Sequence, residues 1–90
     1  MVTMQPSGVV LLPDQCRAAR ALIGWSREDL AKHSGVGAST LSAFEAGTRA
    51  PYARTLADVR RALETAGVIF ISADGAGGPG VRRFKEMDRA

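Results

Sequence analysis

The stretch from Trp25 to Pro51 constrains the fold more than any other part of the chain, because it predicts two short helices joined by a tight turn. Ser26 is suited to cap the first of these helices, and Asp29, three residues later, can complete a capping box with it. Gly35 is the residue most easily placed in the left-handed conformation that ends a helix. The stretch therefore has a defined start and a defined turn.

The second helix of this stretch is expected from about Ala38 to Ala46, with Gly47 closing it. Apolar residues at helical spacing should form the buried side of both helices: Leu30, Ala31, Val36, Leu41 and Phe44. Two short helices joined by a glycine-containing turn can place the second helix in the major groove of DNA. Small helical proteins that bind no DNA contain such units as well, so the pattern alone leaves both interpretations open.

The order of residues in the stretch adds a resemblance to a known family. The order is Ser26-x-Glu28-Asp29-Leu30-Ala31, Gly35-Val36, Ser39-Thr40-Leu41-Ser42 and Phe44-Glu45-x-Gly47-x-Arg49-x-Pro51. It resembles the lambda-repressor-like (Xre-type) helix-turn-helix family of bacterial and phage DNA-binding proteins. The resemblance implies a mainly α fold, in which a four-helix domain binds the major groove of double-stranded DNA as a homodimer. It also implies a transcriptional regulator, of repressor type.

The resemblance further implies which residues face the DNA. The family positions that face base edges are occupied by Ala38, Ser39, Ser42 and Ala43. The candidates for phosphate contacts are Arg27, Thr40, Thr48, Arg49 and, because it lies close to the same loop, Arg54. Glu45 is the family's glutamate near the end of the second helix, and we expect it to be structural. It can pair with the nearby Arg49, which would contribute well under about 1 kcal/mol if the pair is exposed.

The predicted base-facing side lacks the strongest base-reading side chains. Arg, Lys, Asn and Gln make the bidentate contacts that separate one base from another, and none of them occupies this side. Serine can bond to more than one base, and alanine can contact a thymine methyl group. We therefore expect phosphate contacts, DNA shape and bridging water to carry much of the binding.

Composition restricts the remaining functions. The net charge of +3 and the isoelectric point of about 9.8 suit a polyanionic partner. The single cysteine, Cys16, cannot form an internal disulfide and is interpreted as a structural thiol, and no run approaches the roughly 20 apolar residues of a membrane span. We therefore expect a cytoplasmic protein. His33 is the only histidine, and no catalytic order, phosphate loop or metal motif is present, so neither an enzyme nor a cofactor is expected.

The flanking segments divide the chain into an N-terminal arm at 1–12, the helix-turn-helix domain at 13–67, a β-hairpin at 68–85 and a tail at 86–90. Residues 9–12 could form a brief strand or an apolar staple over the first helix, which we expect at 14–23 with Pro13 at its start. The stripe expected to be buried on this helix comprises Cys16, Ala18, Ala19, Leu22 and Ile23. After Pro51, a helix is predicted to begin at Thr55, with Asp58 completing a capping box, and to end at Gly67.

The pattern changes after Gly67, where β-branched and aromatic residues indicate strands around a glycine-rich tip. One face of this hairpin can pack on the helices. The other face, or an open strand edge, would suit a second copy of the chain. The residues predicted to mediate dimerisation are Val68, Ile69, Phe70, Ile71, Val81 and Phe84. The alternative function is an antitoxin or another protein-interaction module with the same fold, which would bind a protein partner.

Overall fold

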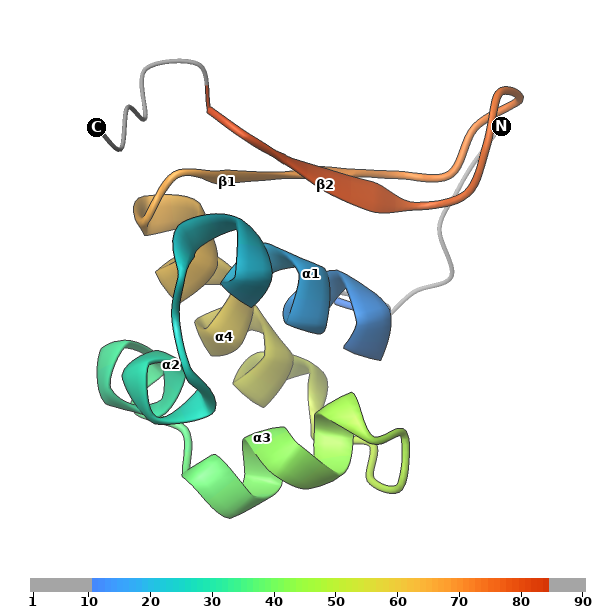
Figure 1. Cartoon of the computed structure of the whole chain (residues 1–90). Coiled ribbons are helices and arrows are strands. Elements are labelled where there is room, and N and C mark those ends of the chain that lie inside the picture. Colours follow the sequence, from blue (N-terminus) through green and yellow to red (C-terminus); the bar gives the residue numbers. More distant parts are fainter. Residues whose placement is uncertain (1–10, 85–90) are drawn as a thin grey trace.

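The structure, a computed structural model, describes residues 11–84. Four helices precede two strands (Figure 1): α1 (Pro13–Ile23), α2 (Arg27–Ser34), α3 (Ala38–Glu45), α4 (Ala53–Thr65), β1 (Val68–Ile71) and β2 (Gly80–Arg83). The predicted fold class, a mainly α domain with a C-terminal hairpin, is confirmed. The expectations for residues 1–10 and 85–90, including most of the N-terminal arm and all of the tail, lie outside the described residues.

A single cluster of buried side chains holds the four helices and the hairpin together. Every helix and β1 contribute to it, and its members are Leu11, Cys16, Ala19, Ile23, Leu30, Leu41, Phe44, Leu56, Val59, Leu63 and Val68. Ala18 was expected on the buried stripe of α1, but it is exposed. The buried polar side chain of Gln15 lies on that side of α1 instead, because it bonds to backbone groups there.

The local signals at α2 act as expected. The Ser26 hydroxyl accepts a hydrogen bond from the Asp29 N–H (3.0 Å), and the Asp29 carboxylate accepts one from the Ser26 N–H (2.9 Å). These bonds satisfy donors at the helix start that have no partner within the helix. Gly35 ends α2 with a φ of 77°, in the left-handed region.

The predicted start of α4 is wrong by two residues. The helix begins at Ala53, with Tyr52 as its N-cap, and no side chain caps it. Thr55 is therefore already the third helical residue, where it cannot serve as the cap that was expected of it. The physical reason is that alanine and arginine are good helix formers, so the helix extends back almost to Pro51, which cannot continue it.

The start of α1 uses a contact that the sequence reasoning missed. Leu12 has no polar side chain, but its N–H donates to the Gln15 Oε1 atom (3.1 Å). The Nε2 atom of Gln15 then donates to the carbonyl oxygen of Gly80 (3.1 Å) and, more weakly, to that of Ile71 (3.5 Å). One side chain thus caps α1 and fastens the hairpin to it.

The hairpin lies across α1 and α4, on the opposite side of the molecule from α3 (Figure 1). The strands are antiparallel, with Ile69 opposite Arg82 and Phe70 opposite Val81. Side chains opposite each other share a face of a sheet. Phe70 and Val81 pack on the core, so Ile69 and Arg82 point away from it. The hairpin therefore covers the core with one face and exposes the other.

Candidate nucleic-acid interface

The outward side of α3 is formed by small side chains. Among the four residues predicted to face bases, Ser39 and Ser42 are exposed, whereas Ala38 and Ala43 are half-buried. Leu41 and Phe44 on the opposite side of α3 are in the core. The structure thus places the four predicted residues on a helix whose inner side is fixed, and gives the two serines the most accessible positions.

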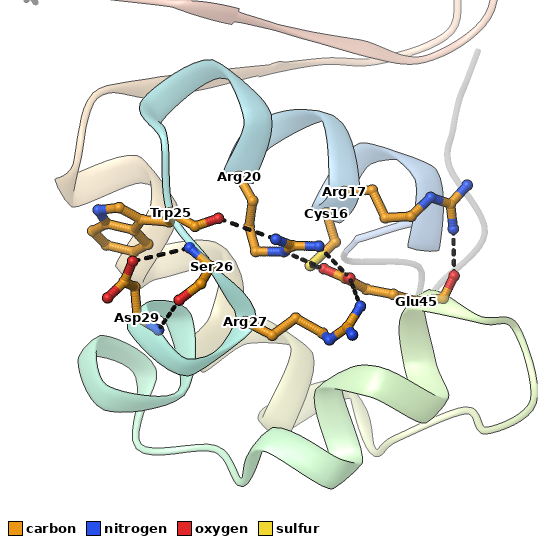
Figure 2. Close-up of polar contacts among 8 residues, drawn as sticks. All are labelled: Cys16, Arg17, Arg20, Trp25, Ser26, Arg27, Asp29 and Glu45. Atoms are coloured by element: carbon orange, nitrogen blue, oxygen red, sulfur yellow. Dashed lines mark hydrogen bonds and ion pairs between the residues drawn. The ribbon is translucent and has the colours of Figure 1, made fainter.

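The C-terminal end of α3 is fixed by its last residue, Glu45, which is only 2% exposed. Its Oε2 atom accepts a hydrogen bond from Arg20 Nε (2.8 Å), and its Oε1 atom accepts one from Arg20 Nη2 (2.7 Å), as Figure 2 shows. The pairing with Arg49 that the sequence left possible does not form, because within residues 11–84 the carboxylate has its partners on α1 and α2. Two parallel bonds to one guanidinium fix both distance and orientation between α1 and α3.

Two further side chains reach the same carboxylate. The Cys16 thiol donates to Glu45 Oε2 (3.0 Å), and Arg27 at the start of α2 lies 3.6 Å from Oε1 (Figure 2). Burial alone would raise the pKa of Glu45, but the hydrogen bonds from Arg20 and Cys16 and the charges of both arginines outweigh it and lower that pKa. Burial and the bond to Glu45 raise the pKa of the Cys16 thiol, so it remains protonated as a donor.

Backbone groups complete the connection among the three helices. Arg17 donates to the carbonyl oxygen of Glu45, at the negatively polarised end of α3. Arg20 also donates to the carbonyl oxygen of Trp25 (3.0 Å), which lies between α1 and α2 (Figure 2). The anchor cluster, defined as Cys16, Arg17, Arg20, Arg27 and Glu45, therefore ties α1, α2 and α3 into one unit.

The predicted phosphate-contacting residues have different surroundings. Thr40 and Arg49 line one surface depression, so the structure brings them together. Arg54 is exposed near the start of α4, and Thr48 is exposed with its hydroxyl donating to the carbonyl oxygen of Ala43 (3.2 Å). Arg27 is exposed in part, but its guanidinium also belongs to the anchor cluster. Its charge is therefore shared between Glu45 and any phosphate.

Tyr52 is a candidate that the sequence reasoning missed. It lines the same depression as Thr40 and Arg49, and it is 87% exposed. Its hydroxyl has no hydrogen-bond partner within the described part of the chain. An aromatic residue directly after a proline, at the end of the loop that follows α3, was the available signal in the sequence.

The six residues predicted to mediate dimerisation separate into two groups. Val68 is 2% exposed and belongs to the core, and Phe70 and Val81 pack against that core. The remaining three, Ile69, Ile71 and Phe84, alternate with these along the strands and lie on the outer face. Ile71 and Phe84 are two of the large apolar residues that the structure leaves exposed. Only this second group is available to a partner through its side chains.

His33, the remaining candidate for a catalytic or metal-binding role, makes contacts within the fold. The His33 ring stacks on Trp25, with ring centroids 4.3 Å apart, and its Nδ1 atom lies 2.9 Å from the carbonyl oxygen of Asp29. Within residues 11–84, no group of three His, Cys, Asp or Glu side chains is arranged to hold a metal ion. In the same range, no helix has the length and apolar character needed to cross a membrane.

These features define a DNA-binding helix-turn-helix domain, with α3 in the position of the helix that enters the major groove. A helix-turn-helix family model (HTH_3) matches residues 17–67, which is more than half of the chain. The protein therefore belongs to the lambda-repressor-like (Xre-type) helix-turn-helix family. No curated protein matches its sequence.

Proposed function

We propose that the protein is a transcriptional regulator of repressor type that binds DNA sequence-specifically as a homodimer. The single observation that carries this proposal is that α3 has an exposed outward side while the buried anchor cluster holds its C-terminal end. A helix held at a fixed angle can place short side chains against base edges reproducibly. Two such helices about 34 Å apart would meet successive major grooves on one side of the duplex.

The proposed contacts divide by chemistry. Ser39 and Ser42 would bond to base edges, with Ala38 and Ala43 contacting thymine methyl groups. Thr40, Arg49 and Arg54 would contact phosphates, and Tyr52 would join them because it lies beside Arg49. Thr48 would contact a phosphate by turning its hydroxyl away from the carbonyl oxygen of Ala43. Arg27 would contribute less than its charge suggests, since Glu45 already engages it. The short base-facing side chains leave a large share of specificity to the shape and flexibility of the duplex.

The experiment that tests the proposal is selection of bound duplexes from a random pool at defined salt. We expect enrichment of a two-fold symmetric site whose half-sites are about 10 base pairs apart. The affinity for that site should fall with salt, with a logarithmic slope of about −0.9 for each neutralised phosphate. A pool that stays random, or an affinity that is unchanged between low and moderate salt, would overturn the proposal.

A protein-interaction role, for instance as an antitoxin, is the second candidate. The observation that favours it is the composition of the outward side of α3, which carries serine and alanine but no Arg, Lys, Asn or Gln that could make a bidentate contact to a base. Purification of the untagged partner with the tagged chain from its own cells distinguishes the two roles. A stoichiometric protein that blocks duplex binding would support the second candidate.

A further inference from the structure

The hairpin and α3 lie on opposite sides of the molecule, with α1 and α4 between them (Figure 1). If two copies stacked the outer faces of their hairpins, their α3 helices would point in opposite directions. Such a dimer could not place both helices on one side of one duplex.

Pairing through strand edges has the opposite consequence. In that arrangement the two-fold axis is perpendicular to the sheet, so the helices of both copies stay on the same side of it. Both α3 helices then face the same direction. The proposed function requires this geometry, and the inference that follows rests on that function.

The hydrogen-bond pattern of the hairpin identifies the groups that are free to pair. The Phe84 N–H donates to the carbonyl oxygen of Gly67 (2.7 Å), and in an antiparallel ladder such pairs alternate with pairs that do not exchange bonds. Ile69 and Ile71 therefore bond to β2, whereas the N–H and C=O groups of Phe70 and Ser72 point away from it. The N–H and C=O groups of Val68 also point away from β2, but this residue is buried. The accessible part of this edge lies around Ile71.

The edge of β2 is less suited to pairing. It carries Arg82 and Arg83, and two copies of β2 paired antiparallel would bring like charges together. It is also preceded by Pro79, which has no N–H to donate. Charged residues and proline are the devices by which proteins protect strand edges from pairing. The uncharged β-branched and aromatic residues of β1 contain neither device.

We propose that two copies of the chain pair antiparallel through the edges of β1, with Ile71 of both subunits at the two-fold axis. The backbone groups of Phe70 bond to those of Ser72 of the partner subunit, and the reverse pair is equivalent. The sheet becomes four-stranded, and the two exposed Ile71 side chains cover each other on its outer face. This short contact is at the low end of interface size, so the free dimer is weak and DNA binding stabilises it.

The test is disulfide trapping of the full chain at the proposed axis. In this register the two Ile71 residues form a pair without mutual hydrogen bonds, whose Cα atoms are about 4.5 Å apart. That distance is within the range that a disulfide spans, about 4.4 to 6.8 Å. We expect Ile71→Cys to form a covalent dimer under mild oxidation. The matched control is Arg82→Cys, which lies on the same outer face but on β2 and should yield several-fold less. The wild-type chain, whose Cys16 is buried, is the second control.

The outcomes separate this proposal from the proposed function. Equal trapping at both positions would indicate face-to-face stacking, and preferential trapping at Arg82→Cys would indicate the β2 edge; either result overturns the inference. Absence of a covalent dimer from Ile71→Cys overturns it as well. Trapping at Ile71→Cys without any binding of a duplex would leave the pairing intact and refute the DNA-binding function. A trapped dimer that binds the symmetric site with undiminished affinity would support both.

A second pair of variants does not depend on disulfide chemistry. Ile71→Asp places two negative charges at the proposed axis and should remove cooperativity in binding to the two half-sites. Arg82→Asp changes the charge on the neighbouring strand and should retain cooperativity. Circular dichroism of both variants should match that of the wild type, because both side chains are exposed. The reverse result would place the interface on β2.

Discussion

The outward side of α3 and its C-terminal end differ in the strength of the interactions that their side chains can make. Outside, the side chains are short and neutral. Inside, Glu45 meets two guanidinium groups and a thiol in a buried site. The difference indicates that the strong interactions of this protein fix the direction of α3, whereas the base contacts that we propose for its outward side would be individually weak. We therefore expect the loss of an anchor contact to cost more free energy than the loss of a base-facing hydroxyl.

The largest predicted effect comes from Glu45→Gln. This variant replaces the buried carboxylate with a neutral amide, which leaves the Arg20 guanidinium without its counter-charge and with one acceptor oxygen instead of two, so it should lower the free energy of unfolding by about 3–5 kcal/mol. That loss is a large part of the stability of a small domain. Urea denaturation followed by circular dichroism measures it.

Glu64→Gln provides the matched control for this prediction. Glu64 also accepts a hydrogen bond from an arginine, Arg60, but the pair is exposed on α4 (3.0 Å). Its loss should cost less than about 1 kcal/mol. Similar losses for both variants would contradict the assignment of Glu45 as the anchor.

The second prediction concerns acid. The pKa of Glu45 in the folded protein is below its ordinary value of 4.5, so the unfolded chain takes up this proton first as the pH falls. The stabilisation is therefore fully present above about pH 4.5 and is lost as the pH falls through the lowered pKa. Hydrogen bonds from Ser26 lower the pKa of the exposed Asp29 and act in the same direction.

Urea denaturation at a series of pH values measures this effect. The free energy of unfolding should change little between pH 7 and 5 and decrease at lower pH. In Glu45→Gln the decrease should be smaller, because the titrating group is absent. A decrease of equal size in both proteins would assign the acid sensitivity to other carboxylates.

Features of α2 and α3 that depend on neighbouring residues were predictable from the sequence, whereas contacts between distant residues were not. The start and end of α2 depend on Ser26, Asp29 and Gly35, which act within a few residues, and all three predictions are confirmed. The family resemblance supplied the fold and the place of α3. Proximity in sequence suggested Arg49 as a partner of Glu45, whereas Arg20 reaches the carboxylate from 25 residues away.

The hairpin illustrates the same limit. Residue type indicated a hairpin at 68–85, since β-branched and aromatic side chains favour strands, and both strands lie within that range. It could not assign which side chains face the core, because four apolar residues in succession show no alternation. The packing of α1 and α4 decides that question and places Val68 inside. Gln15 fastens the end of β1 and the facing start of β2 to α1, again from a distance in sequence that local patterns do not cover.

The third prediction tests the phosphate contacts around α3. Arg49→Ala should weaken binding to all duplexes by a similar factor and reduce the salt slope by about 0.9, because one phosphate contact is lost. Arg49 is a better probe than Arg27, whose removal would also disturb the anchor cluster. Arg83→Ala, on the hairpin, is the charge-matched control and should leave the slope unchanged. A change of sequence preference in Arg49→Ala would assign Arg49 to base reading.

The smallest predicted effect is that of the base-facing serines. Ser39→Ala removes one hydroxyl from an exposed position, and a single hydroxyl should discriminate by less than the ~1–3 kcal/mol of a bidentate contact. We expect a changed preference at one position of each half-site, with stability preserved because the hydroxyl has no partner within the described residues. Repeated selection from a random pool measures the preference, and Thr65→Ala, which removes an exposed hydroxyl at the end of α4, is the control. If Ser39→Ala instead weakened binding equally for every sequence, α3 would contact phosphates there, and specificity would come from DNA shape alone.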